Sequence, residues 1–134
     1  MKPDNNIKHL FSPWRMDYVS KPSSKEGDVF LDALNSDDDR ESLILFRGDL
    51  SFIIMNLYPY NNGHLMVVPY RKVNSMINLN QNELSEIIKL SPNSMDIIKK
   101  ELNADGFNFG VNFGKCAGAG IDDHIHFHVV PRWN

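Results

Sequence analysis

Three histidines alternate with apolar residues near the C-terminus, in the run His124-Ile125-His126-Phe127-His128. Alternate side chains of a β-strand point to the same face, so the run predicts a strand with three imidazoles on one side, about 6.5–7 Å apart. The intervening apolar residues, with Val129, are expected to point into the core. Packing alone does not explain the pattern, because three buried imidazoles would each need a polar partner. The histidine face is therefore a candidate site.

Two kinds of chemistry suit a row of imidazoles. Neutral imidazole is the commonest ligand for zinc and copper, and Asp122 and Asp123 just upstream offer carboxylates. Alternatively, an imidazole nitrogen can attack phosphorus while neighbouring N–H groups hold the phosphate oxygens. The histidine spacing alone leaves both chemistries open.

The segment before the histidines favours phosphate. Residues 114–120 contain three glycines, whose backbone N–H groups can approach an anion closely and form a concave nest. Asn112, at the predicted strand end, and Lys115, in the loop, add polar contacts, although Lys115 also fits an ordinary solvated lysine. We therefore expect a phosphate site to which Gly118 and Gly120 contribute backbone N–H groups.

Length and composition fit a single globular domain. The chain has 134 residues, of which 42% are hydrophobic and 23% charged, which excludes a disordered or collagen-like chain. A net charge of −3 argues against a broad electrostatic contact with a nucleic-acid polymer. No run is long enough to cross a bilayer, the N-terminus lacks the apolar stretch of a signal peptide, and the single cysteine, Cys116, fits a reducing compartment. We therefore expect a cytoplasmic protein that has no membrane partner.

The order of the predicted elements indicates an α+β domain, with an N-terminal arm and loop at 1–27 and the domain proper at 28–134. A short helix is expected over Val29 to Leu34 with Asp28 as its N-cap, and the acidic run 37–39 is expected to be a solvated loop. About five strands of a mainly antiparallel sheet are predicted, at 43–46, 52–55, 64–68, 106–113 and 124–130. One long helix, predicted at 82–102, is expected to lie on one face of this sheet. Pro92 predicts a kink in that helix, or two helices with Ser91 capping the second.

Two motifs resemble those of a known family. The segment His124 to Val130 resembles the histidine-triad (HIT) signature, in which histidine–apolar pairs repeat three times before another apolar residue. Residues 56–69 are similar to the family's second hallmark, a Gly-His pair that opens the strand beneath the active site. The resemblance runs from about Leu43 to Trp133. The arm at 12–18 and the ending at 128–134 are similar to the microbial branch that includes diadenosine tetraphosphate phosphorylases.

The resemblance implies roles for the matching histidines. His126 corresponds to the family's nucleophile, and His128 to the residue that holds oxygens of the phosphorus under attack. His124 corresponds to the residue that orients His126 through its backbone. His64 corresponds to the fourth family histidine, packed beside the triad.

Four further residues match the nucleotide-binding positions of the family. Asn56 corresponds to a residue that contacts the ribose hydroxyls, and Asn112 to a polar residue near the phosphates. Ile54 and Met66 correspond to apolar positions that sandwich the base.

Each of these assignments has a structural alternative. Asn56 is also placed to initiate the turn before Pro59, and His64 also fits a core histidine whose polar partners are satisfied. Ile54 and Met66 alternate correctly for one strand face, so core packing explains them equally well.

The chain departs from the family pattern at three places. Many relatives have glutamine or serine three or four positions before the first triad histidine, where this chain has Gly120 and Ile121. Some relatives carry a Cys-x-x-Cys zinc pair where this chain has residues 28–31, so we predict no structural zinc and no other metal site. Relatives of the branch continue past the Arg132–Asn134 step, so we expect the contacts of a C-terminal tail to be missing.

The resemblance implies a nucleotidyl transferase or hydrolase that acts on the α-phosphate of a nucleoside polyphosphate, with diadenosine tetraphosphate as the expected substrate. The reaction would pass through a covalent nucleotidyl-histidine, with phosphate or water as the acceptor. No cofactor is obligatory, although magnesium can accompany the polyphosphate, and a homodimer with sheets joined edge to edge is expected. Because the attacking nitrogen must be unprotonated, activity should fall below about pH 6. The alternatives are a nucleotide-binding module with little turnover, an adenosine phosphoramidate hydrolase and a metal-binding histidine protein.

Overall fold

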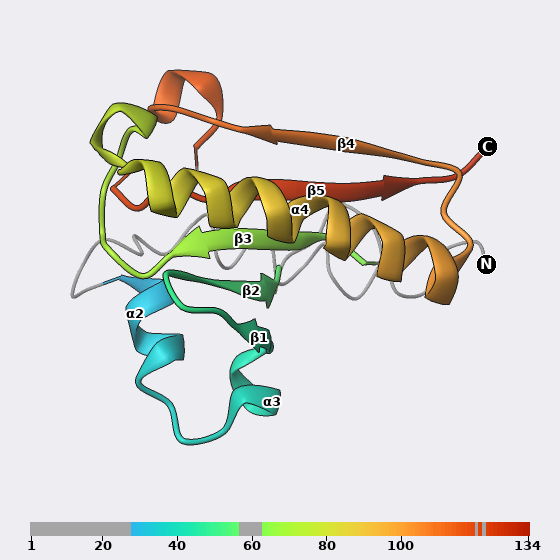
Figure 1. Ribbon diagram of the computed structural model, residues 1–134, viewed down its shortest axis with the longest axis horizontal. Helices are drawn as coiled ribbons and strands as arrows, with labels where there is room; N and C mark the ends of the chain where they lie inside the picture. The colour runs from blue at the N-terminus through green and yellow to red at the C-terminus, as the bar shows by residue number, and fades with distance from the viewer. Residues whose placement is uncertain (1–27, 57–62, 120, 122) are drawn as a thin grey trace.

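The computed structural model describes residues 28–56, 63–119, 121 and 123–134, so the predicted N-terminal arm lies outside the described residues. Within them, five strands form one antiparallel sheet in the order β1-β2-β3-β5-β4 (Figure 1). The strands are β1 (Ile44–Arg47), β2 (Ser51–Met55), β3 (Leu65–Pro69), β4 (Gly106–Val111) and β5 (Phe127–Arg132). The expected α+β class and five-stranded antiparallel sheet are confirmed.

The long helix α4 (Gln81–Leu102) covers one face of the sheet (Figure 1). It begins with a capping box, in which the Asn80 side chain accepts from the N–H of Glu83 and the Glu83 carboxylate accepts from the N–H of Asn80. The helix packs on the sheet through one apolar cluster, here called the α4 cluster, whose buried members are Ile53, Leu65, Val67, Leu79, Ile87, Ile98, Ala104, Ile125, Phe127 and Val129. The inward orientation predicted for the apolar residues of the histidine run is thereby confirmed.

Pro92 lies inside α4 without dividing it. Proline has no N–H, so the carbonyl of Ile88 loses its helical donor, but Ile88 lies on the exposed side, where water can donate instead. Ser91 does not cap a second helix; its hydroxyl donates to the carbonyl of Ile87 at 2.7 Å. The alternative of two helices is therefore wrong, and one helix of 22 residues crosses the sheet. No described helix, α4 included, is long and apolar enough to cross a membrane.

The short helix α2 (Val29–Leu34) packs on the sheet face opposite α4, because its Phe30 contacts the residues of β2 and β3 that alternate with those of the α4 cluster. Asp28 is its N-cap, as predicted: Oδ1 accepts from the N–H of Phe30 at 2.7 Å and of Leu31 at 3.2 Å. Phe30 is the buried side chain of the helix. It belongs to a second apolar cluster, here called the α2 cluster, whose other buried members are Ile44, Phe52, Ile54, Met66 and Val68.

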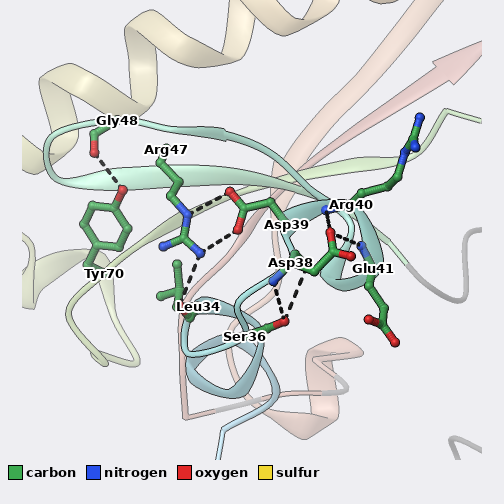
Figure 2. A network of polar contacts seen from close by, with 9 residues as sticks. All are labelled: Leu34, Ser36, Asp38, Asp39, Arg40, Glu41, Arg47, Gly48 and Tyr70. Atoms are coloured by element: carbon green, nitrogen blue, oxygen red, sulfur yellow. Dashed lines mark hydrogen bonds and ion pairs between the residues drawn. The ribbon is translucent and has the colours of Figure 1, made fainter.

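The acidic run is more ordered than the solvated loop expected from the sequence. Asp38 caps the helix α3 (Asp39–Ser42) by accepting from two backbone N–H groups of its first turn. The Asp39 carboxylate accepts from the Arg47 guanidinium at 2.7 and 3.0 Å (Figure 2). The same guanidinium donates to the carbonyl of Leu34 at 3.2 Å, which ties the last residue of α2 to β1. Arg47 therefore joins α2, α3 and the edge of the sheet.

Two 3-10 turns complete the described elements. The first, η2 (Met76–Asn78), precedes α4. The second, η3 (Lys115–Ala117), lies in the glycine-containing loop between β4 and β5.

Candidate active site

Four of the five histidines lie in the described residues, and they gather on the sheet face opposite α4. His128 lies on β5, in register with Met66 on β3 and Gly110 on β4. Directly paired residues of a sheet point to the same side, and Met66 belongs to the α2 cluster. The His128 ring therefore lies on the α2 side of the sheet.

The strand predicted for the histidine run begins only at Phe127. His124 and His126 precede it, but the alternation of side chains persists. Ile125 lies in the α4 cluster, whereas the Phe30 ring on the other face lies 5.2 Å, between centroids, from each of the two imidazoles. The predicted division of this run into a core face and a histidine face is correct, even though the predicted strand start is wrong.

Both ring nitrogens of His124 face acceptors. Nδ1 lies 2.5 Å from Oδ2 of Asp28, and Nε2 lies 2.8 Å from the carbonyl oxygen of Pro69. A backbone carbonyl only accepts, so Nε2 carries a hydrogen. Burial by itself raises the pKa of Asp28, but hydrogen bonds and charge from His124, with two backbone N–H groups, lower it below its usual value. Asp28 is therefore held as a carboxylate, and the His124 ring lies between two acceptors, one at each edge.

His126 is oriented by the main chain of His124. Its Nδ1 lies 2.9 Å from the carbonyl oxygen of His124, so Nδ1 carries the hydrogen and Nε2 keeps the lone pair of the neutral ring. Burial lowers the pKa of His126, although the hydrogen bond to that carbonyl opposes the shift. The ring is therefore neutral near pH 7, with an available nucleophilic nitrogen.

A second chain of hydrogen bonds fixes His128. The amide Nδ2 of Asn56 lies 3.2 Å from Nδ1 of His64, and an amide nitrogen only donates. His64 therefore carries its hydrogen on Nε2, which donates across 2.8 Å to Nδ1 of His128. Burial and the neighbouring His126 lower the pKa of His128 to about 4. A neutral His128 whose Nδ1 accepts must carry its hydrogen on Nε2.

These two series of hydrogen bonds leave the neighbouring rings of His126 and His128 with opposite hydrogen-bonding roles at Nε2. His126 offers a lone pair on Nε2, and His128 offers an N–H at the same position of its ring. Their centroids are 4.9 Å apart, closer than the strand spacing expected from the sequence, and the rings are inclined at 73°. A nucleophile beside a hydrogen-bond donor suits attack on an electrophilic centre that carries oxygens.

The expected phosphate-binding residues lie at the end of β4 and in the loop that follows. Asn112 directly follows Val111, whose partner on β5 is Phe127 at the start of the histidine strand, and its side chain is exposed. Gly118 ends η3 with φ +93°, and a Cβ added there would lie 3.7 Å from Nδ2 of Asn112. The structure thus brings these two residues together. Gly120 lies outside the described residues.

Ile54 and Met66, expected to sandwich a base, are paired across β2 and β3. Both are buried in the α2 cluster, in the same row as His128 on the next strand. They contribute to the apolar layer around the histidines, as the packing alternative requires. A contact with a base at these positions stays a prediction.

The sequence interpretation missed the second function of Asp28 and the position of Phe30 against the histidines. Asp28 was recognised as a helix cap, and one carboxylate oxygen is sufficient for that purpose. Its partner His124 is 96 residues away, so no local pattern reveals the pair.

Among the described residues, no three histidine, cysteine, aspartate or glutamate side chains are grouped so that they could hold a metal ion. The ring contacts explain why the triad does not form such a group. Both nitrogens of His124 are engaged, and His64 and His128 bond to each other. Asp122 lies outside the described residues, and the carboxylate of Asp123 lies 3.2 Å from Lys72.

The sequence and the fold of this chain are similar to those of known proteins. The HIT domain family model matches residues 38–134. The AP-4-A phosphorylase of Mycobacterium tuberculosis is 36% identical over 137 residues, which cover 96% of this chain and 70% of that protein. The bis(5'-adenosyl)-triphosphatase of Dictyostelium discoideum is 33% identical over 93 residues, which cover 69% of this chain and 62% of that protein. The crystal structure of a HIT family protein from Bacillus anthracis superposes with a TM-score of 0.63 and 26% identity, over 68% of this chain and 64% of that one.

Proposed function

Because the chain belongs to the HIT domain family, we propose that it is a nucleotidyl transferase or hydrolase that acts on the α-phosphate of a nucleoside polyphosphate. The observation that carries the proposal is the pairing of an accepting Nε2 on His126 with a donating Nε2–H on His128. The names of the relatives from M. tuberculosis and D. discoideum support a dinucleoside polyphosphate as substrate. Diadenosine tetraphosphate is the substrate we propose.

In the first step, Nε2 of His126 attacks the α-phosphorus. A bond forms between nitrogen and phosphorus, the bond from phosphorus to the bridging oxygen breaks, and ATP leaves. His128 donates its Nε2–H to an oxygen of the attacked group and stabilises the negative charge that develops there. The ring of His126 becomes positive as it attacks, and its Nδ1–H keeps the hydrogen bond to the carbonyl of His124.

In the second step, an acceptor takes the adenylyl group from His126. With inorganic phosphate the product is ADP, and with water it is AMP. Asn112 and Gly118 are proposed to contact the phosphates, together with Gly120. No cofactor is obligatory in this proposal, although magnesium can accompany the polyphosphate. Asn56 keeps its proposed contact with the ribose, in addition to its hydrogen bond with His64.

A second candidate is a nucleotide-binding module with little turnover. Ile121 occupies a position before the triad where many relatives have a polar residue, and it packs against the α2 cluster. An apolar side chain there cannot assist the leaving group. This candidate predicts tight AMP binding without release of product.

Product analysis tests the proposal. Wild type and His126→Ala are incubated with diadenosine tetraphosphate, with and without inorganic phosphate, and both are melted thermally to show that the variant is folded. We expect wild type alone to release ATP. Because the bond between nitrogen and phosphorus hydrolyses in acid, wild type is quenched in alkaline denaturant, where we expect it to carry one adenylyl group by mass spectrometry. Turnover by a folded His126→Ala would exclude the nucleophile. No product from wild type on this substrate or on an adenosine phosphoramidate would favour the binding module.

We also propose an oligomeric state and a cellular location. The outer strands β1 and β4 are the sheet edges through which two copies would join as a homodimer, which light scattering coupled to gel filtration tests. Cys116 is a free, exposed thiol, which supports a cytoplasmic location that cell fractionation tests.

A further inference from the structure

We infer that Asp28 is a positioning residue for His126, acting through His124. The inference rests on the proposed role of His126 as nucleophile and adds a residue outside the triad to that site. It assigns to the N-terminus of α2 the task of holding the reactive ring.

The contact between Asp28 and His124 is built to hold one ring orientation. Both side chains are fully buried, and the contact of 2.5 Å between Oδ2 and Nδ1 is opposed on the other edge of the ring by the carbonyl of Pro69 at 2.8 Å. A ring fixed at both edges cannot turn without leaving a buried polar group unpaired, which costs about 1–3 kcal/mol. Asp28 thereby determines where His124 lies.

The position of His124 determines the orientation of His126. The carbonyl oxygen of His124 is the acceptor for Nδ1 of His126, so a displaced His124 releases that hydrogen and allows the ring to turn or change tautomer. The Phe30 ring packs against both imidazoles at 5.2 Å and comes from the turn that Asp28 caps. One residue therefore secures both the acceptor and the apolar side chain beside it.

The helix that carries Asp28 is fixed at its other end. Arg47 donates to the carbonyl of Leu34, the last residue of α2, while it also binds Asp39 (Figure 2). The helix α2, which positions Asp28 against His124, is therefore tied to β1 through Arg47 and also packs in the α2 cluster. This fixed helix allows a carboxylate so far away in the sequence to act on the triad.

Among the described residues, the Lys72 ammonium is a further charged group that faces Asp28. Nζ of Lys72 lies 3.9 Å from Oδ2 of Asp28 and 3.2 Å from Oδ2 of Asp123. The contact to Asp123 is the shorter, and both of those side chains are partly exposed. Asp123 supplies a matched control, because it is an acidic neighbour of the same lysine that makes no described contact with the His124 ring.

The variant Asp28→Ser separates positioning from capping. Serine caps helices as well as aspartate does, so its hydroxyl oxygen can keep the backbone N–H groups of the first turn, but it has no second oxygen to accept from Nδ1 of His124. Asp28→Asn is the matched variant, because its amide Nδ2 can donate to Nδ1 of a neutral His124 ring that keeps its Nε2 hydrogen on the Pro69 carbonyl. Asparagine therefore leaves the ring held at both edges, whereas serine removes the Asp28 contact.

The experiment compares wild type, Asp28→Asn, Asp28→Ser and Asp123→Asn. Histidine ring protonation is measured by proton–nitrogen correlation NMR, with kcat and KM on diadenosine tetraphosphate and thermal melting. We expect wild-type His126 to be protonated on Nδ1 only. In Asp28→Ser, His126 should populate both tautomers and kcat should fall by about tenfold or more at similar KM, whereas Asp28→Asn should keep the Nδ1–H form and more of the activity. Asp123→Asn should match wild type.

Unchanged kcat and an unchanged His126 tautomer in Asp28→Ser would overturn the inference. A lower melting temperature with wild-type kcat would also overturn it, because Asp28 would then be a cap only. If wild type has no activity, the proposed function fails by itself. In that case the His126 tautomer in Asp28→Ser still decides the inference: a mixture supports it and a single Nδ1–H form rejects it.

Discussion

Nε2 of His64 lies 2.8 Å from Nδ1 of His128, so one hydrogen bond joins the start of β3 to the middle of the site. This bond determines which nitrogen of His128 carries hydrogen and faces the proposed substrate. The fourth histidine is therefore more than a satisfied core residue, because its hydrogen bond fixes the tautomer of its neighbour.

The donor on His64 can be tested with two variants of similar size. His64→Leu removes the donor to His128, and we expect kcat to fall by about tenfold or more. His64→Gln retains an amide that can donate at the same place, and we expect it to keep more activity than His64→Leu. Steady-state kinetics on both folded variants provide the measurement. Equal losses in the two would show that the hydrogen bond is irrelevant to turnover.

Activity should extend to lower pH than the unperturbed histidine value suggests. The pKa of His126 is lowered by burial, and that of His128 is lowered to about 4. Both rings stay neutral below the ordinary value of about 6.5, so the loss of kcat/KM expected below about pH 6 from the sequence should move toward lower pH. A pH profile of kcat/KM measures it. An acid limb centred at or above the unperturbed value would contradict the buried arrangement.

The free energy of unfolding should decrease in acid because of His128. The folded-state pKa of His128, about 4, lies below its unfolded value near 6.5, so the unfolded chain binds the proton first as pH falls. Its contribution is fully present above the unfolded pKa and is lost as pH falls through the folded pKa, up to about 3 kcal/mol. Urea unfolding of wild type and His128→Gln between about pH 7.5 and about pH 4 measures this. If the free energy of unfolding changed with pH in the same way in wild type and His128→Gln, this prediction would be refuted.

Gly63 should tolerate no side chain. Its φ is +85°, and an added Cβ would lie 2.8 Å from Cδ1 of Leu102 and 3.2 Å from Cγ of Pro131. We expect Gly63→Ala to destabilise the fold by about 1–3 kcal/mol, because both backbone strain and a clash oppose it. Thermal and urea unfolding measure the change. Gly106→Ala, where nothing lies within 4 Å of the added atom, is the control and should lose less.

Gly110 should keep room for the substrate beside His128. The two residues are paired across β4 and β5, and a Cβ at Gly110 would meet nothing within 4 Å. Valine suits a strand, so Gly110→Val should fold normally while raising KM by about tenfold through steric exclusion. Gly106→Val, on the same strand but paired with Arg132, should leave KM unchanged. Equal KM values for both variants would place the substrate elsewhere.

The alternation of the histidine run was sufficient to predict which side chains enter the core, because a period of two leaves only two faces. It did not predict that β5 begins at Phe127, since the pairing of a strand depends on where its neighbours end. Pro92 illustrates the same limit. Whether a proline divides a helix depends on tertiary packing, and here Ile87 and Ile98 bury both halves of α4 on one sheet.

The site was only partly predictable for a related reason. Local residue types indicated the triad and the cap at Asp28, because both depend on neighbours in the chain. The use of the second oxygen of Asp28, and the choice of tautomer on His128, depend on contacts between distant segments. Those contacts arise only when α2 docks on the sheet.

The two oxygens of Asp28 couple the opening of α2 to the state of the site. Transient fraying of this short helix would withdraw the carboxylate from His124 while the rest of the sheet stays folded. A subglobal opening of this kind is visible as hydrogen exchange at the amides of Phe30 and Leu31, which Oδ1 protects. The exchange rate of two backbone amides should therefore report, residue by residue, the fraction of molecules whose site is incomplete at any moment.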